Sequence, residues 1–496
     1  MSGDHEDAAA AAREFGHQFS EFMNWAHTVG AADDAPLTRL IKAHLGGADD
    51  EPVVSRRWGA FEQVNLQRAV EAWTVQPGRE VRVQGLSIPD GFSGVSLGQV
   101  IDGSHLPPMR LSAPDVTDLP SGPGESLACW NRALLLVRDA AGPYAVLISG
   151  PQPHEEASVR FEIAGLPMAE AQSVLGDLEE SRARLNVYRG QTVIASMTPM
   201  GGIALTFATT ERVQRADVIL PTAVLDRIER HAIAISAHAD RLTAAGQHLK
   251  RGLLLYGPPG TGKTHTVRYL IGARDHATRI LMQGEALRAV GQITTLAREL
   301  APSVVVLEDV DLVAEDRSYG EINPVLFDLL DAMDGSAADA DLLFVLTTNR
   351  AEVLERALIQ RPGRIDVAVE IDRPDEGARR KLLRLYGAEV LAALSDEDLE
   401  QVVERSDGVT ASFLKELIRR AVLSALNDDR VSRCTLPDLT DALDDLLDQA
   451  QSVTRSLLGL SGDESSDEAV DDGTTGYRSV ARPGVYRARP RRGRLP

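Results

Sequence analysis

The chain has 496 residues, more than one typical hydrophobic core holds, so two or three domains and a tail are expected. Its net charge of -21 argues against a surface that coats nucleic acid, and no apolar run reaches the ~20 residues that a membrane span needs. It has two cysteines, Cys129 and Cys434, and an acidic first segment without a signal-peptide pattern, which together predict a cytoplasmic protein without disulfides.

The first 215 residues are predicted to form an N-terminal region, a helical segment followed by an α+β module. Helical spacing of apolar residues predicts helices at 7–28 and 57–73, whereas residues 89–124 are rich in turn formers and predict loops. A helix is expected at 168–185, and strands are expected at 134–137, 144–148, 158–163 and 192–197. We find no catalytic constellation in this region.

Residues 216–374 alternate strands with helices, which predicts a parallel sheet covered on both faces. An amphipathic helix that ends near His238 comes first, and the predicted strands lie at 253–256, 279–282, 304–307 and 342–347. Residues 375–450 have purely helical periodicity. Residues 451–496 predict a disordered tail, in which an acidic block at 463–472 precedes seven arginines within 477–496.

A glycine-rich loop directly follows the apolar run at 253–256 and precedes a predicted helix. It has the phosphate-binding pattern G-x-x-x-x-G-K-[ST], and the expected nucleotide contacts extend to the next residue: Gly257, Pro258, Pro259, Gly260, Thr261, Gly262, Lys263, Thr264 and His265. Glycines let backbone N–H groups turn toward phosphate oxygens, Lys263 would neutralise the β and γ phosphates, and the Thr264 hydroxyl would ligate Mg²⁺. The loop therefore predicts binding of a nucleoside triphosphate with Mg²⁺.

Polar residues follow two of the predicted strands. The strand at 304–307 ends in Glu308 and Asp309, at the sheet edge where the phosphate loop is also expected. Glu308 would hold Mg²⁺ through water, and Asp309 would polarise the attacking water. The strand at 342–347 leads to Asn349, whose amide could orient water beside the γ phosphate. Arg361 and Arg364 surround a Pro-Gly turn, which suits presentation of guanidinium groups to a neighbouring molecule.

Together these motifs resemble the AAA family of ATPases over residues 217–449. Residues 326–335, Leu-Phe-Asp-Leu-Leu-Asp-Ala-Met-Asp-Gly, add to the resemblance. It implies a P-loop NTPase α/β domain at 216–374 with a helical lid at 375–450, binding of ATP and Mg²⁺, and a homo-oligomeric ring, usually a hexamer. It also implies that Arg361 and Arg364 reach the ATP of the next subunit, and that Ile219 and the segment from Gly408 to Ala411 surround the adenine.

Three features depart from the family pattern. The acidic strand ends in Glu308-Asp309 where the family usually has Asp-Glu, and a similar inversion occurs in the branch that resembles the mitochondrial respiratory-complex assembly ATPase. Residues 288–291 read Arg-Ala-Val-Gly where unfolding members carry an aromatic pore loop. The last residues lack the hydrophobic-tyrosine-any motif of proteasome-docking members. An HExxH motif is also absent, which argues against a fused metalloprotease.

Three functions are compatible with these motifs. We favour an ATP-hydrolysing ring that remodels a protein partner, in which residues 1–215 recognise a client or adaptor. A nucleic-acid-associated motor or loader is the second hypothesis, because the arginines from Arg487 to Arg494 could bind a phosphate backbone. The third is a nucleotide-gated scaffold with slow hydrolysis, which the Glu308-Asp309 order permits.

Overall fold

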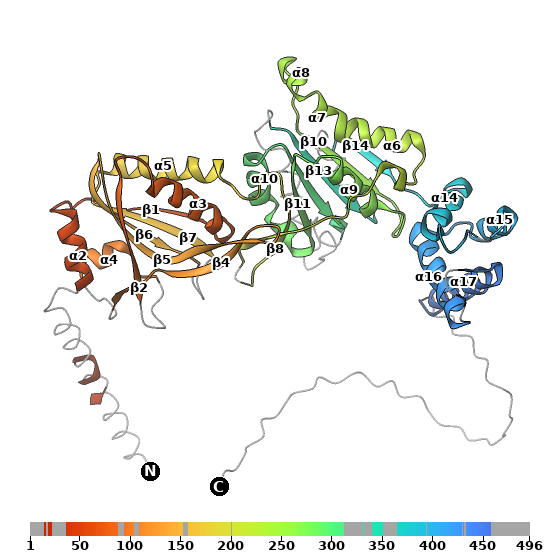
Figure 1. Cartoon of the computed structure of the whole chain (residues 1–496), viewed down its shortest axis with the longest axis horizontal. Helices are drawn as coiled ribbons and strands as arrows, with labels where there is room; N and C mark the ends of the chain where they lie inside the picture. Colours follow the sequence, from red (N-terminus) through yellow and green to blue (C-terminus); the bar gives the residue numbers. More distant parts are fainter. Residues whose placement is uncertain are drawn as a thin grey trace, which may run out of the picture. The chain divides into compact units, whose positions relative to one another are not determined.

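The structure is a computed structural model of the chain (Figure 1). The residues it describes are 14–15, 18–21, 36–87, 94–103, 109–151, 157–199, 201–311, 331, 340–350, 365–392, 394–428, 430 and 433–457. Most of the helix predicted at 7–28, most of the segment at 326–335, and all of the charged tail lie outside these residues. Within the described ranges, no helix combines the length and the apolar character that crossing a membrane requires.

The first sheet is antiparallel and has the strand order β1-β7-β6-β5-β2-β3, with β4 paired to β5 (Figure 1). Its strands are β1 (Val54–Gly59), β2 (Glu80–Ser87), β3 (Arg110–Ser112), β4 (Asp115–Gly122), β5 (Glu125–Asp139), β6 (Gly142–Ser149) and β7 (Ser158–Ala164). Because side chains alternate along a strand, Leu135 packs with α3 (Gln63–Thr74) and α5 (Met168–Arg184), whereas Leu134 packs with α2 (Pro36–Leu45) and α4 (Leu97–Asp102).

Two expectations for this region are wrong. The helix predicted at 57–73 begins only at η1 (Ala60–Glu62), because Val54–Gly59 forms the edge strand β1, whose alternating exposure matches a strand and not a helix. The segment at 89–124, predicted as loops, contains α4, β3 and β4. Its proline and glycine residues mask the strand pattern, since Pro120 is tolerated in β4, which pairs on one side with β5.

The second sheet has the order β14-β10-β13-β12-β11-β8-β9 (Figure 1). Its strands are β8 (Thr192–Met197), β9 (Ile203–Phe207), β10 (Arg251–Tyr256), β11 (Thr278–Gln283), β12 (Ser303–Glu308), β13 (Leu342–Thr348) and β14 (Val367–Glu370). All pairs are parallel except the antiparallel pair of β8 with the edge strand β9. The central strands are apolar on both faces and form two core clusters, which confirms the predicted parallel sheet.

Helices cover both faces of the second sheet. One core cluster includes residues of α6 (Thr222–Glu229) and α9 (Lys263–Gly272); the other includes η4 (Gly284–Ala289) and α10 (Val290–Glu299). The helix predicted to reach His238 is built from α6, a π-helical turn (Arg230–Ala234) and α7 (Ile235–Ala237), with η2 (Arg215–Asp217) before it and α8 (Ala239–Ala244) after it.

The segment after β14 is helical, as its periodicity predicts. It contains α14 (Glu376–Gly387), α15 (Asp396–Arg405), α16 (Ala411–Asn427) and α17 (Leu436–Leu457). The prediction that the disordered tail begins at residue 451 is wrong for residues 451–457, because the amphipathic pattern of α17 continues through them. Asp375, Ser395 and Thr410 each accept a backbone N–H at the start of the first three of these helices, which satisfies donors that have no partner within the helix.

The second sheet extends into the region predicted to be N-terminal. Strand β8 pairs in parallel with β11, and β9 pairs with β8, so both strands lie in this sheet although they precede residue 215. Val64 of α3 and Cys129 of β5 belong to the same core cluster as Ile280 of β11. The boundary at residue 215 stays a prediction, but the N-terminal region and the second sheet share a hydrophobic core.

A buried guanidinium group strengthens the junction between the N-terminal region and the second sheet. Arg182 of α5 forms ion pairs with Glu62 at 2.9 Å, with Glu179 at 2.6 Å, and with Glu299, the last residue of α10, at 2.6 Å. Only 5 % of its side chain is exposed. Burial raises the pKa of Glu62, although the nearby Arg182 acts in the opposite direction. One cation thus holds three carboxylates from both sides of the junction.

Replacing Arg182 by methionine is expected to lower the free energy of unfolding by about 3 kcal/mol, because it leaves carboxylates buried without their cation. Urea unfolding followed by circular dichroism measures the change. Arg184→Met, in the same helix but exposed, is the matched control and should change stability by less than about 0.5 kcal/mol. Equal stabilities of the two variants would contradict a structural role for the Arg182 cluster.

Candidate nucleotide-binding site

The phosphate loop lies between β10 and α9, as predicted. Gly257, Gly260 and Gly262 have φ values of 138°, 79° and 107°, in the region that favours glycine. A Cβ atom on Gly257 would lie 2.3 Å from the carbonyl oxygen of Ile371, so only glycine fits there. The loop is therefore pressed against the chain that follows β14, and its backbone conformation depends on its glycines.

Lys263 begins α9 and folds back over the loop. Its Nζ donates hydrogen bonds of 2.8 Å to the carbonyl oxygens of Gly257 and Pro258, and the residue is 6 % exposed. Burial lowers the pKa of Lys263, while the nearby carboxylates Asp309 and Asp311 act in the opposite direction. An ammonium group at the centre of the loop, close to two acids, is suited to a phosphate and a divalent cation together. The next residue, Thr264, is exposed.

Glu308 and Asp309, at the acidic end of β12, have different surroundings. Glu308 is buried, and its carboxylate accepts a hydrogen bond from Gln283 Nε2 at the end of β11. Asp309 has φ 50°, which turns the chain away from the strand direction. Asn349 Nδ2 donates to Asp309 Oδ1 at 3.3 Å, so the structure brings together these two predicted residues.

Sequence reasoning missed several polar residues at this edge. Gln283 lies opposite Glu308 in the register of β11 and β12, and Thr347 Oγ1 accepts the backbone N–H of Asp309 at 3.1 Å. Asp311 accepts hydrogen bonds from the hydroxyl of Thr348 and the backbone N–H of Asn349. Gln283 could have been found from the sequence, because it is a polar residue directly after the strand predicted at 279–282, and the next predicted strand ends in Glu308.

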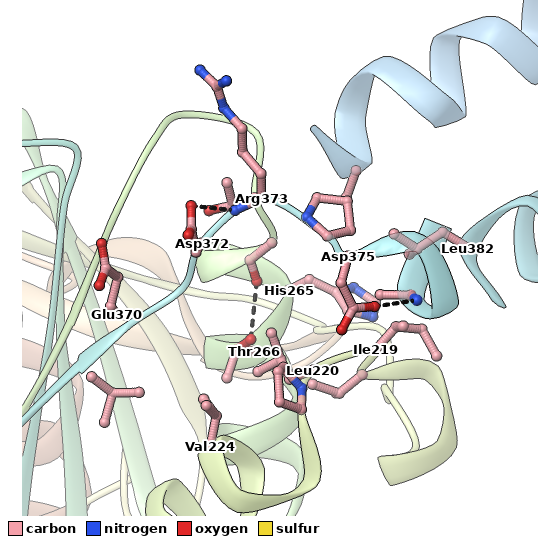
Figure 2. Close-up of a pocket in the computed structure, with 18 of the residues that line it drawn as sticks. Ile219, Leu220, Val224, His265, Thr266, Glu370, Asp372, Arg373, Asp375 and Leu382 are labelled. Carbon is pink, nitrogen blue, oxygen red and sulfur yellow. Dashed lines mark hydrogen bonds between the residues drawn. The ribbon is translucent and has the colours of Figure 1, made fainter. Parts of the chain in front are cut away.

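A cavity of about 690 Å³ lies beside the loop (Figure 2). Figure 2 shows residues from several parts of the chain around it: the segment with Ile219 and Leu220, helix α9 with His265, the end of β14 and the segment after it with Glu370 and Asp372, and helix α14 with Leu382. Its lining combines apolar residues such as Leu220 and Val224 with charged residues such as Asp372 and Arg373, so it can contact both apolar and polar parts of a small molecule. The His265 ring nitrogen Nε2 lies 3.1 Å from the carbonyl oxygen of Asp217, which ties α9 to the segment before Ile219.

The lid helices close one side of this cavity. Ala411, the first residue of α16, lines it, and the Ser412 N–H donates to the Gly260 carbonyl at 3.0 Å, so the lid contacts the phosphate loop directly. Gly408 lies outside the lining, in the turn after α15 with φ 75°. Its role at the adenine stays a prediction.

Two further predictions concern other parts of the domain. Arg361 and Arg364 lie outside the described residues, so their action on a neighbouring subunit stays a prediction. At the expected pore-loop position, Ala289 and Val290 are buried in the core cluster of the second sheet. Those two residues pack inside the domain, so they do not present a gripping surface.

Comparison with known proteins identifies the domain around this site. The family model described as "ATPase family associated with various cellular activities (AAA)" matches residues 253–373. The proteasome-activating nucleotidase of Methanothermobacter thermautotrophicus is 33 % identical over 213 residues, 40 % of this chain and 51 % of that protein. The 26S proteasome regulatory subunit 8 homolog of Schizosaccharomyces pombe is 30 % identical over 238 residues, 45 % of this chain and 58 % of that protein.

A third relative, the ATP-dependent zinc metalloprotease FtsH 3 of Synechocystis sp., is 31 % identical over 234 residues, 44 % of this chain and 38 % of that protein. The chain thus spans about half the length of the curated relatives it matches. Among solved structures, the match to the FIGL-1 AAA domain in complex with ADP covers 50 % of this chain and 92 % of that chain, at 19 % identity and a TM-score of 0.40. The family model and the curated relatives agree with the phosphate loop and the parallel sheet, and they identify residues 253–373 as a domain of the AAA family of ATPases.

Proposed function

We propose that the chain hydrolyses ATP with Mg²⁺ and uses the cycle to remodel a protein partner, in a cytoplasmic ring of identical subunits, six by family resemblance. The observation that carries this proposal is the convergence at one sheet edge. Lys263 in the phosphate loop faces Asp309 and Asp311, and Asp309 is bonded to Asn349, beside a cavity of about 690 Å³.

The residues present fit a nucleotide and a magnesium ion. The loop offers backbone N–H groups and the Lys263 ammonium to phosphate oxygens, while Ile219, His265 and Ala411 line the cavity that would take the base. The Thr264 hydroxyl and the Glu308 carboxylate would hold Mg²⁺, which when bound neutralises phosphate charge. These oxygen ligands are of the type that Mg²⁺ prefers.

Asp309 is the residue suited to polarise the attacking water. Its carboxylate is oriented by Asn349, whereas Glu308 is more deeply placed and bonded to Gln283. A carboxylate held in this way accepts a proton from water as the γ phosphate is attacked. The arginines Arg361 and Arg364 of an adjoining subunit would offset the charge of the transition state, as the family resemblance implies.

The names of the relatives support a protein as the partner. They include a proteasome-activating nucleotidase, a proteasome regulatory subunit and an ATP-dependent metalloprotease. The N-terminal region is the part of this chain that we assign to client or adaptor recognition. Because it shares a core with the second sheet, movements of that sheet during the ATP cycle would be transmitted to it without a flexible linker.

One observation favours the slow, nucleotide-gated scaffold as a second candidate. Asp309 is one methylene shorter than glutamate and has a left-handed backbone, so its carboxylate position is constrained by φ 50° and by Asn349. Tight ATP binding with little phosphate release under all client conditions would support this candidate over the remodelling ring.

Lys263→Ala is expected to weaken ATP binding by about 100-fold or more, because the charged hydrogen bonds to the phosphates are lost. Titration calorimetry with ATP and Mg²⁺ measures it. Lys42→Ala, on α2 in the first-sheet region, removes the same charge and should leave the affinity unchanged. Unchanged ATP affinity in the Lys263→Ala variant would refute the assigned phosphate loop.

Asp309→Asn is expected to lower the hydrolysis rate about 100-fold or more while ATP stays bound, because the amide cannot accept the proton. Glu308→Gln should instead raise the Mg²⁺ concentration needed for half-maximal activity. Phosphate release and nucleotide retention on gel filtration measure both. If Glu308→Gln alone retains ATP without hydrolysing it, the two roles are reversed.

Arg364→Ala is expected to retain ATP binding but to lower hydrolysis in the assembled form by about a thousandfold, since its guanidinium acts on the neighbouring subunit. Mixed rings provide the sharper measurement. Lys263→Ala subunits still supply Arg364, so mixing them with Arg364→Ala subunits should restore part of the phosphate release. Mixtures as inactive as the separate variants would contradict action between subunits.

A further inference from the structure

Three arginines and one serine lie side by side on four neighbouring strands of the first sheet. In the strand registers, Arg57 of β1 is opposite Arg160 of β7, Arg160 is opposite Ser149 of β6, and Ser149 is opposite Arg132 of β5. We call these four residues the arginine row. They line one small cavity together with residues next to the start of α4.

The arginine row lies on the sheet face that α2 and α4 cover. Leu134 and Leu147, two positions along β5 and β6 from Arg132 and Ser149, are buried against those helices, and side chains two apart share a face. Arg57 is exposed, and 17 % of the Arg160 side chain is exposed. The row therefore lies where the apolar cover ends, and solvent reaches it from the β1 side.

The row has an excess of positive charge among the described residues. Arg57 and Arg160 are directly opposite each other, an arrangement that destabilises a sheet. Two carboxylates are nearby: Glu162 lies 3.7 Å from Arg160, and Asp115 is opposite Arg132 in the register. Glu162 also accepts the backbone N–H of Leu97 at 3.2 Å.

Neither carboxylate is fully available to the row. Burial raises the pKa of Glu162, although Arg160 and, more weakly, Arg57 act in the opposite direction, and part of its bonding capacity is used at the start of α4. Asp115 accepts a hydrogen bond from Asn131 and lies at the β5 end of the row, away from the opposed pair Arg57 and Arg160. An additional anion at the pair would relieve the repulsion.

We propose that the arginine row binds a carboxylate of an acidic peptide segment in the client or adaptor, an inference that rests on the client-recognition role proposed above. Guanidinium groups bind carboxylates through paired hydrogen bonds, and three of them are placed within one row. The cavity of about 20 Å³ admits one small group and not a ring. Because the whole chain carries a charge of -21, an acidic peptide would approach it only where positive charge is concentrated.

The test measures binding of a fluorescent hexaglutamate peptide to the full chain without nucleotide, by anisotropy at low salt. A hexaglutamine peptide of the same length is the neutral control. The double variant Arg57→Gln/Arg160→Gln should bind hexaglutamate about tenfold more weakly. Arg82→Gln/Arg138→Gln removes two exposed arginines elsewhere on the same sheet and should leave binding unchanged.

A second variant keeps the test decisive if removal of the arginines disturbs folding. Ser149→Asp places a fixed carboxylate in the middle of the row, so it should raise the melting temperature and abolish hexaglutamate binding. Equal binding by the double variant and its control, equal binding of both peptides, or a lower melting temperature in Ser149→Asp would overturn the proposal. The readout needs no ATP, so a failure of the proposed hydrolysis leaves it interpretable.

The chain's own acids are tested as the alternative occupant. Glu155 and Glu156 follow β6, and the tail holds Asp463, Glu464, Asp467, Glu468, Asp471 and Asp472. Each group is changed to the corresponding amides in the full chain. Unchanged hexaglutamate affinity in both variants supports a client peptide as the occupant. If either variant gains binding that the unmodified chain lacks, the chain occupies its own row and the proposal is overturned.

Discussion

Parallel pairing of β10, β13 and β12 is the constraint on which the candidate site depends. In parallel strands the carboxyl ends lie at one edge of the sheet, so the phosphate loop after β10, Asn349 after β13 and Asp309 after β12 meet there although they are far apart in sequence. Because these strands are apolar on both faces and helices cover both sides, their polar residues lie only where each buried run ends. The buried apolar runs of these strands therefore fix the position of the polar groups at their ends.

Close packing of the loop adds to this constraint. Gly257 is pressed against the carbonyl of Ile371, and the Gly260 carbonyl accepts the N–H of Ser412 in the lid. A change of loop conformation would thus displace both the chain after β14 and helix α16. This gives the proposed ATP cycle a direct physical route from phosphate contacts to the orientation of the lid.

The sequence predicted the parts of the molecule that have strong local patterns. Strands β10, β12 and β13 contain continuous apolar runs, and the phosphate loop has a specific motif, so these elements and their shared sheet edge could be predicted. Strand β1 was missed because its arginines and tryptophan fit either period, and β4 because of its proline. The pairing of β8 with β11 could not be predicted, since strand partners are set by tertiary contacts that leave no local pattern.

Two arginine clusters of the N-terminal region differ in charge balance, and this difference suits one to a structural role and the other to ligand binding. At Arg182, three carboxylates surround one cation that is almost wholly buried, so the cluster is closed and joins α5 to α10. In the arginine row, the cations exceed the nearby described carboxylates and two of them oppose each other at an accessible strand. A closed cluster gains nothing from a ligand, whereas a row with unbalanced charge gains from any anion that reaches it. The same residue type thus forms a rigid connection to the ATPase domain at one end of the region and a surface for an acidic partner at another.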